Sequence, residues 1–291
     1  MNFVVTHALQ ATPLLLAAAL LELLLPRTTS PRLRACIWIV AALKLLLPAP
    51  ASSAFGVLPR VDVDGEWLLT VWGWGAAVFA ITMSTRTLAA VVKLRRGARL
   101  DEAMSARGVK VYRTVAIASP LLAGGALYWP ADTEGLSEAE QEQAFQHEMS
   151  HLRRKDAWRA LAWSALVVCY WFHPLVWYAA YRMQAIREMC CDDDARRGGG
   201  YDAGAYRMAL AKFAARAATQ SPRPALAFAD PRAPLTERLT LIREPRRTWS
   251  VAICALLLLS CAWPVASWTN WVERPEGSLQ LKYMVLKETG R

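Results

Sequence analysis

Two histidines and a glutamate, arranged as His147-Glu148-x-x-His151, are the residues of this chain best suited to chemistry. Histidines four positions apart lie on one face of a helix, so both imidazoles can bind the same metal ion. Glu148 would then lie beside the water bound to that ion, where a carboxylate can act as a general base in hydrolysis. The alternative is an accidental match on an exposed amphipathic helix.

A hydrolytic zinc site of this type needs a third protein ligand and one open position for water. The stretch 187–194 supplies candidates for that ligand. We expect Glu188 to bind the metal and Asp192, one helical turn later, to orient a ligating histidine. Cys190 and Cys191 are the rival ligands, although a closed cysteine site would be structural rather than catalytic. For the acidic run Asp192–Asp194, the simpler interpretation is a solvated helix end.

A capped helix and a small β-element must position these residues. Ser137 and Glu140 have the spacing of a capping box, which predicts that the helix carrying the histidines begins at Ser137. Residues 109–117 have the alternating pattern of a strand, with Val115 on its apolar face. We expect Ala126–Trp129 to pair back onto this strand after a turn.

The composition indicates a membrane protein. The chain of 291 residues is 55% hydrophobic and carries 13 Trp, a residue that gathers at membrane interfaces. Its six cysteines form no C-x-x-C pair, which excludes a secreted disulfide scaffold. The net charge of +10 suits nucleic acid or an anionic membrane surface. Four stretches are long and apolar enough to be candidate spans, namely residues 1–25, 35–58, 67–85 and 251–268.

Basic clusters beside these stretches orient them. Lys and Arg follow the first and third stretches and precede the fourth, which predicts that the N-terminus is outside and residues 95–248 are cytoplasmic. The position of the clusters favours orientation and lipid headgroup contact over nucleic-acid binding. Glu22 and Lys44 either pair between the first two helices or extend toward the interface.

A fifth apolar stretch, Ala160–Tyr181, has 22 uncharged residues. A single crossing by this stretch would place Glu188 on the opposite side of the membrane from His147, and the two could not share a metal. The dipeptide His173-Pro174 interrupts it and disfavours one straight helix. We therefore expect the segment to dip into the membrane and return, or to lie buried beneath the catalytic region, with His173 structural rather than a ligand.

In combination, these stretches resemble the BlaR/MecR-type membrane metallopeptidases, the antirepressor family of bacterial β-lactam sensor-transducers. The resemblance covers almost the whole chain, because spans in the same order flank the matching motifs. The matching stretches are Ser119–Gly124 with Trp129-Pro130, Leu136–Asp156 containing HEMSHLRRKD, WFHPLVW at Trp171–Trp177, Glu188 with Cys191-Asp192, and Leu235–Ile242.

The resemblance implies a gluzincin-like zinc endopeptidase at the cytoplasmic face of the bacterial inner membrane. In that family an external event activates cleavage of a transcriptional repressor and of the enzyme itself. His147, His151 and Glu188 match the family's metal ligands, and Glu148 matches its general base. Asp156 matches a family aspartate just beyond the motif, where it either orients a ligand or pairs with a surface arginine.

Family sensors also carry a large penicillin-binding domain after the last span. Only 23 residues follow Trp268 here, so we do not expect this chain to bind a β-lactam covalently. The proline-rich segment 221–234 is the expected autolysis region, near Ala227-Phe228. Tyr206 and Arg207 are the candidate oxyanion donors, and the sequence does not choose between them.

We therefore predict a mainly α integral membrane protein that combines four transmembrane helices with a gluzincin-like α+β protease domain. Residues 1–94 would hold three spans, 95–248 the cytoplasmic protease with the membrane-dipping segment 160–181, and 249–291 the last span and a short external tail. The predicted partners are a cytoplasmic repressor and the lipid bilayer, without direct nucleic-acid contact, and a homo-oligomer or a separate sensor is compatible with the sequence.

Two alternatives accompany this prediction. The first keeps Zn²⁺ but makes the chain a processing protease for peptides or membrane proteins, similar to the CAAX-type family. The second is a non-catalytic membrane adaptor whose short tail contacts a partner. Zinc stoichiometry separates the adaptor from both enzymes, whereas a substrate is needed to separate the enzymes from each other.

Overall fold

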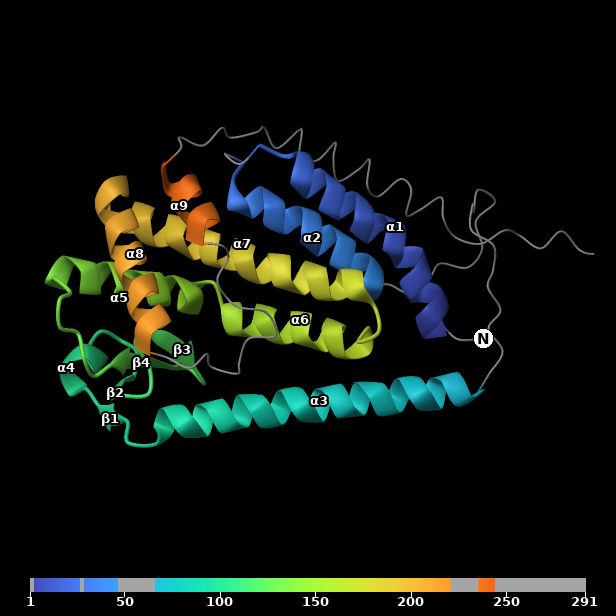
Figure 1. The fold of residues 1–291 in the computed structure, drawn as a ribbon, viewed down its shortest axis with the longest axis horizontal. Coiled ribbons are helices and arrows are strands. Elements are labelled where there is room, and N and C mark those ends of the chain that lie inside the picture. The colour runs from blue at the N-terminus through green and yellow to red at the C-terminus, as the bar shows by residue number, and fades with distance from the viewer. Residues whose placement is uncertain (1–2, 27–28, 47–65, 221–234, 244–291) are drawn as a thin grey trace, which may run out of the picture.

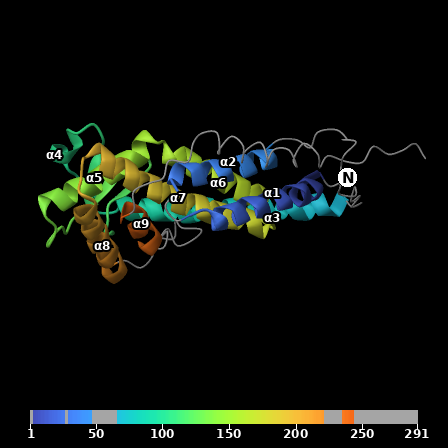
Figure 2. The ribbon, with the colours of Figure 1, turned by 90° about the horizontal axis from the view of Figure 1, so that it is seen from above.

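The computed structural model describes residues 3–26, 29–46, 66–220 and 235–243. This part of the chain is an elongated, mainly helical body with a small sheet at one end (Figure 1). The long α7 is central, with α2 and α1 on one side and α6 and then α3 on the other. Figure 2 shows α5, α8 and α9 near the end that lies away from the N-terminus. The helices named so far are α1 (Phe3–Leu24), α2 (Pro31–Leu46), α3 (Glu66–Arg95), α5 (Glu138–Arg153), α6 (Asp156–Cys169), α7 (Pro174–Gly198), α8 (Ala203–Gln220) and α9 (Leu235–Arg243).

One helix in the described ranges is long and apolar enough to cross a membrane. It is the part of α3 from Trp67 to Arg95, with 29 residues and a mean hydropathy of 1.5. Ala11–Leu24 of α1 forms a shorter apolar helix, and α2 includes residues 35–46 of the expected span 35–58, whose remainder lies outside the described residues. The expected span 251–268 lies outside the described residues, so the four spans stay a prediction.

The sheet has the strand order β1-β2-β4-β3. Its strands are β1 (Arg99–Leu100), β2 (Val111–Thr114), β3 (Leu121–Ala123) and β4 (Ala126–Pro130), and the short helix α4 (Glu102–Ser105) connects the first two. Gly124 and Gly125 have φ of 56° and 77°, a backbone that glycine adopts without strain, and they form the tight β3–β4 turn. Val111, Leu127 and Trp129 pack with Phe145 of α5, so the sheet supports the helix that carries the histidines.

Two details of the expected β-element are wrong. Ala126–Trp129 does pair with residues 111–114, but in parallel, because β3 rather than β2 is the strand that turns back onto β4. Val115 is 89% exposed rather than part of an apolar face, because β2 ends at Thr114 and the alternation stops there. The expected turn before Ala126 is present, but it joins β3 to β4 rather than β2 to β4.

The capping box expected at the start of α5 is present. The Ser137 hydroxyl accepts a hydrogen bond from the Glu140 backbone N–H, and the Glu140 carboxylate accepts one from the Ser137 backbone. These reciprocal bonds satisfy two of the free N–H groups at the helix start. The helix therefore begins where the sequence predicts, two and a half turns before His147.

The apolar stretch Ala160–Tyr181 folds as parts of two helices rather than one. The α6 helix ends at Cys169, and α7 begins at Pro174, where the missing N–H of proline is tolerated. His173 is buried at this turn and its Nε2 lies 3.0 Å from Thr12 Oγ1 of α1. The chain thus reverses direction at His173, as expected, and α7 returns alongside α5 and α6.

The buried carboxylate of Glu22 joins α1 to its neighbours. It accepts a hydrogen bond from Trp38 Nε1 of α2 at 2.6 Å and another from Arg182 Nε of α7 at 3.1 Å. The carboxylate of Glu22 thus pairs with Arg182, a partner that neither alternative for Glu22 and Lys44 included. This arginine lies on α7, and a sequence cannot show its position before the hairpin fold is known.

Candidate metal centre

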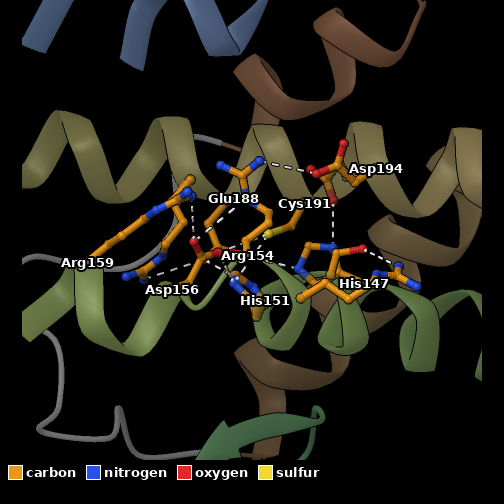
Figure 3. A network of polar contacts seen from close by, with 12 residues as sticks. His147, His151, Arg154, Asp156, Arg159, Glu188, Cys191 and Asp194 are labelled. Carbon is orange, nitrogen blue, oxygen red and sulfur yellow. Dashed lines mark hydrogen bonds and ion pairs between the residues drawn. The ribbon is translucent and has the colours of Figure 1, made fainter. Parts of the chain in front are cut away.

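His147 and His151 lie one turn apart on α5 and point toward α7 (Figure 3). The centroids of their rings are 5.0 Å apart, and the ring planes are nearly perpendicular. Both side chains are only 13% exposed. The helical spacing therefore places two imidazoles on one buried face, as the sequence predicts.

Glu188 of α7 faces both imidazoles. Its Oε2 lies 3.5 Å from Nε2 of His147, and its Oε1 lies 3.7 Å from Nε2 of His151. The ligand atoms of the three residues lie within 4.8 Å of one another. This proximity depends on the reversal at His173, which brings α7 back beside α5. Two imidazole nitrogens and a carboxylate are a donor set that suits zinc with an open fourth position.

Asp192 lies behind His147. Its Oδ1 is 3.0 Å from Nδ1 of His147, the ring nitrogen opposite to the one that faces Glu188. The Asp192 carboxylate is almost fully buried, and Arg238 of α9 donates two hydrogen bonds to it, each 2.7 Å long. A carboxylate at Nδ1 holds the proton there and leaves the Nε2 lone pair free for a metal.

Asp156 takes the corresponding place behind His151. Its Oδ2 is 2.9 Å from Nδ1 of His151, and Arg159 donates to its other oxygen at 3.3 Å (Figure 3). Asp156 is the first residue of α6 and follows Lys155, whose φ of 55° is left-handed. Among the described non-glycine residues, Lys155 is the one with positive φ. This residue turns the chain so that Asp156 faces back toward α5.

The two cysteines differ in their relation to the site. Cys191 Sγ lies 3.3 Å from Nδ1 of His151 and 3.3 Å from Oδ2 of Asp156, on the side of the ring away from Glu188. Burial raises the pKa of the Cys191 thiol to about 12, so it is neutral near pH 7 and suited to hydrogen bonding. Cys190 is also buried but belongs to no group of potential ligands within the described residues.

Charge coupling among these groups is strong. Burial disfavours the imidazolium form, but the hydrogen bonds that His147 donates to the Asp192 and Glu188 carboxylates outweigh it and raise the pKa of His147. For His151, burial is likewise outweighed by the charge of Glu188 and the bond to Asp156, and its pKa is also raised. Burial acts against the Glu188 carboxylate, yet the facing imidazoles hold its pKa well below the usual value. Metal binding must therefore release protons from this cluster.

The remaining candidates occupy different places. Glu148 lies between the two histidines on α5 and is buried. The Tyr206 hydroxyl donates to Asp192 Oδ1 at 3.3 Å and lies 3.3 Å from Nδ1 of His147, which favours orientation of that ring over contact with substrate. Arg207, the next residue of α8, has a buried Nε without a hydrogen-bond partner in the ranges that the structure describes.

Arg238 is the residue of this site that the sequence did not single out. It lies within the matched stretch Leu235–Ile242, but α9 is short and its charged residues show no spacing typical of a metal site. The available signal was the adjacent pair Glu237-Arg238 on a short helix. Only the packing of α9 against α7 reveals that the arginine contacts Asp192.

A known protein family matches more than half of the chain. The family model described as BlaR1 peptidase M56 matches residues 59–242. The match includes α3, the sheet and each candidate ligand, and it ends within α9. No curated protein matches the chain.

Proposed function

Because the chain belongs to the BlaR1 peptidase M56 family, we propose that it is a membrane-embedded zinc endopeptidase that cleaves a cytoplasmic protein. Membership implies a membrane-associated metallopeptidase with a role in signal transduction. The observation that carries the finer proposal is the convergence of His147 Nε2, His151 Nε2 and the Glu188 carboxylate on one point.

The chain's own residues divide the chemistry as follows. Zinc, when bound by His147, His151 and Glu188, would polarise the peptide carbonyl and lower the pKa of an attacking water toward ~7. Glu148 removes a proton from that water and delivers it to the leaving amine. Asp192 and Asp156 keep the proton of each imidazole on Nδ1, so that both Nε2 lone pairs face the same point.

The proposed substrate class rests on the resemblance to the family and on the expected topology. We propose a transcriptional repressor as substrate, with the metal centre on the cytoplasmic side. The basic end of α3, with Lys93 and Arg95 in its last turn, supports this orientation by the positive-inside rule. Self-cleavage is the second part of this proposal, and its expected region, residues 221–234, lies outside the described residues.

The decisive variant is Glu148→Gln in the full chain, reconstituted in lipid nanodiscs. We expect one zinc per chain, by elemental analysis, in both wild type and variant. Hydrolysis of a fluorescent casein and clipping seen in intact mass should fall about 10²- to 10⁴-fold in the variant. His147→Ala should lose the metal as well as the activity.

Glu142→Gln is the matched control. Glu142 lies on the same helix but faces outward, where it pairs with Arg107 at 2.7 Å. We expect this variant to keep zinc and activity. A zinc-loaded Glu148→Gln protein that cleaves as fast as wild type would refute the general-base role, and a metal-free wild type would favour the adaptor alternative.

A further inference from the structure

The Asp192 carboxylate has an unusually complete set of partners. Arg238 Nε donates to its Oδ2 and Arg238 Nη2 to its Oδ1, both at 2.7 Å, which is the paired geometry of a planar guanidinium on a carboxylate. The same Oδ1 contacts Nδ1 of His147 at 3.0 Å. One carboxylate thus joins the guanidinium of α9 directly to a candidate ligand on α5.

Both side chains of this ion pair are buried, so its loss should be costly. The side chains of Asp192 and Arg238 are 2% and 13% exposed. A buried carboxylate that loses its cation is strongly destabilised, and its remaining contacts rearrange. The Tyr206 hydroxyl, at 3.3 Å, is a neutral donor and cannot replace the charge. Among the described lysine and arginine side chains, Arg238 is the one that pairs with this carboxylate.

Arg238 of α9 also lies near a second carboxylate of the metal centre. Arg238 Nη1 lies 3.9 Å from Glu188 Oε2, so the guanidinium lies beside two carboxylates of the centre. The preceding residue, Glu237, faces elsewhere and accepts hydrogen bonds from Arg182 of α7 at 3.0 and 3.1 Å. Adjacent residues of α9 therefore make similar ion pairs with α7, but only one of these pairs reaches the metal centre.

We propose that Arg238 is a positioning residue of the metal centre, which fixes the Asp192 carboxylate against Nδ1 of His147 and so directs Nε2 of that imidazole toward the metal. This inference rests on the proposed function, because positioning has an effect only if the centre binds zinc. It assigns a role in the site to α9, whose Arg238 lies 50 residues after Glu188.

The test compares Arg238→Gln with Glu237→Gln in the full chain in nanodiscs. Zinc affinity is measured by competition with a chromophoric chelator, and the ligand field by the visible spectrum of the cobalt-loaded protein. Loss of an orienting partner costs about 10- to 100-fold in metal affinity, which is the drop we expect for Arg238→Gln together with an altered cobalt spectrum. Glu237→Gln removes a similar ion pair from the same helix, and its affinity and spectrum should match wild type.

A double variant separates positioning from general stability. If Arg238 acts through Asp192, Arg238→Gln combined with Asp192→Asn should bind zinc no more weakly than Asp192→Asn alone. Should Arg238→Gln fail to fold, Arg238→Lys decides, because lysine keeps the charge but not the paired geometry, and its affinity must still fall.

Three outcomes overturn the inference: wild-type affinity in Arg238→Gln or in a folded Arg238→Lys, equal losses in Arg238→Gln and Glu237→Gln, or additive losses in the double variant. Failure of the inference is distinct from failure of the proposed function. Zinc bound tightly by wild type and Arg238→Gln alike would overturn only the positioning role, whereas a wild type without zinc affinity would overturn both.

Discussion

The two histidines of the metal centre are supported in different ways. His151 is oriented by Asp156, five residues further along the chain, and the arginines near that carboxylate, Arg154 and Arg159, come from the same stretch. His147 is oriented by Asp192, which lies on α7 and is held by Arg238 of α9. The first support is local in sequence, and the second requires three helices to pack together.

This difference shows which part of the site depends on the fold as a whole. A local support forms as soon as the turn between α5 and α6 is made. The distant support forms only when the α6–α7 hairpin has closed and α9 has docked. Substitutions that disturb helix packing should therefore displace His147 more readily than His151.

The largest expected effect comes from substitution of Glu188, which faces both histidines. Glu188→Ala removes the carboxylate that faces both Nε2 atoms, so zinc affinity should fall by more than the roughly 100-fold limit for orienting residues. Chelator competition measures the loss. Gln184→Ala, one helical turn earlier on α7, is the control and should bind zinc as wild type does. If Glu188→Ala kept most of its affinity, Glu188 and the two histidines would not converge on one metal.

The next largest effect distinguishes the two supports by stability. Asp192→Asn leaves the guanidinium of Arg238 buried without its carboxylate, and such losses cost about 3–5 kcal/mol. Asp156→Asn leaves Arg159, which is 53% exposed and can be solvated, and Arg154, which keeps its ion pair with Asp194 at 3.2 Å, so the cost should be nearer the ~1 kcal/mol typical of exposed pairs. Thermal unfolding of the zinc-free proteins compares them. Equal destabilisation would contradict the distinction between local and distant support.

The smallest expected effect concerns Arg159, the exposed arginine that pairs with Asp156. Arg159→Ala removes an exposed, i,i+3 ion pair with Asp156, and such pairs contribute about 0.2–1 kcal/mol at most. Zinc affinity should change by less than about threefold, since Asp156 still contacts Nδ1 of His151. The same chelator assay measures it, with Arg197→Ala as a control on another exposed pair. A loss comparable to that of Asp156→Asn would show that the local support also depends on its cation.

The same contrast separates what the sequence could predict from what it could not. The capping box, the facing histidines and the reversal at His173 depend on neighbouring residues, and the sequence predicts each of them. The parallel pairing of β2 with β4 and the contacts of Arg238 and Glu22 depend on which surfaces meet after long connections. Glu188 could be proposed only because a bound metal requires a third ligand, a chemical constraint that acts over any sequence distance.

The left-handed backbone at Lys155 has a consequence for solution conditions. Ion pairs at the protein surface weaken as added salt screens their charges. The left-handed torsion at Lys155 costs steric energy, so the surrounding contacts hold it, among them the backbone hydrogen bond from its N–H to the Leu152 carbonyl, which joins neutral groups and is little screened by salt. Glycine at position 155 would retain this conformation at lower steric cost, whereas valine would resist it. We therefore expect the turn that carries Asp156 toward His151 to be less sensitive to salt than the exposed ion pair of Arg159 with Asp156.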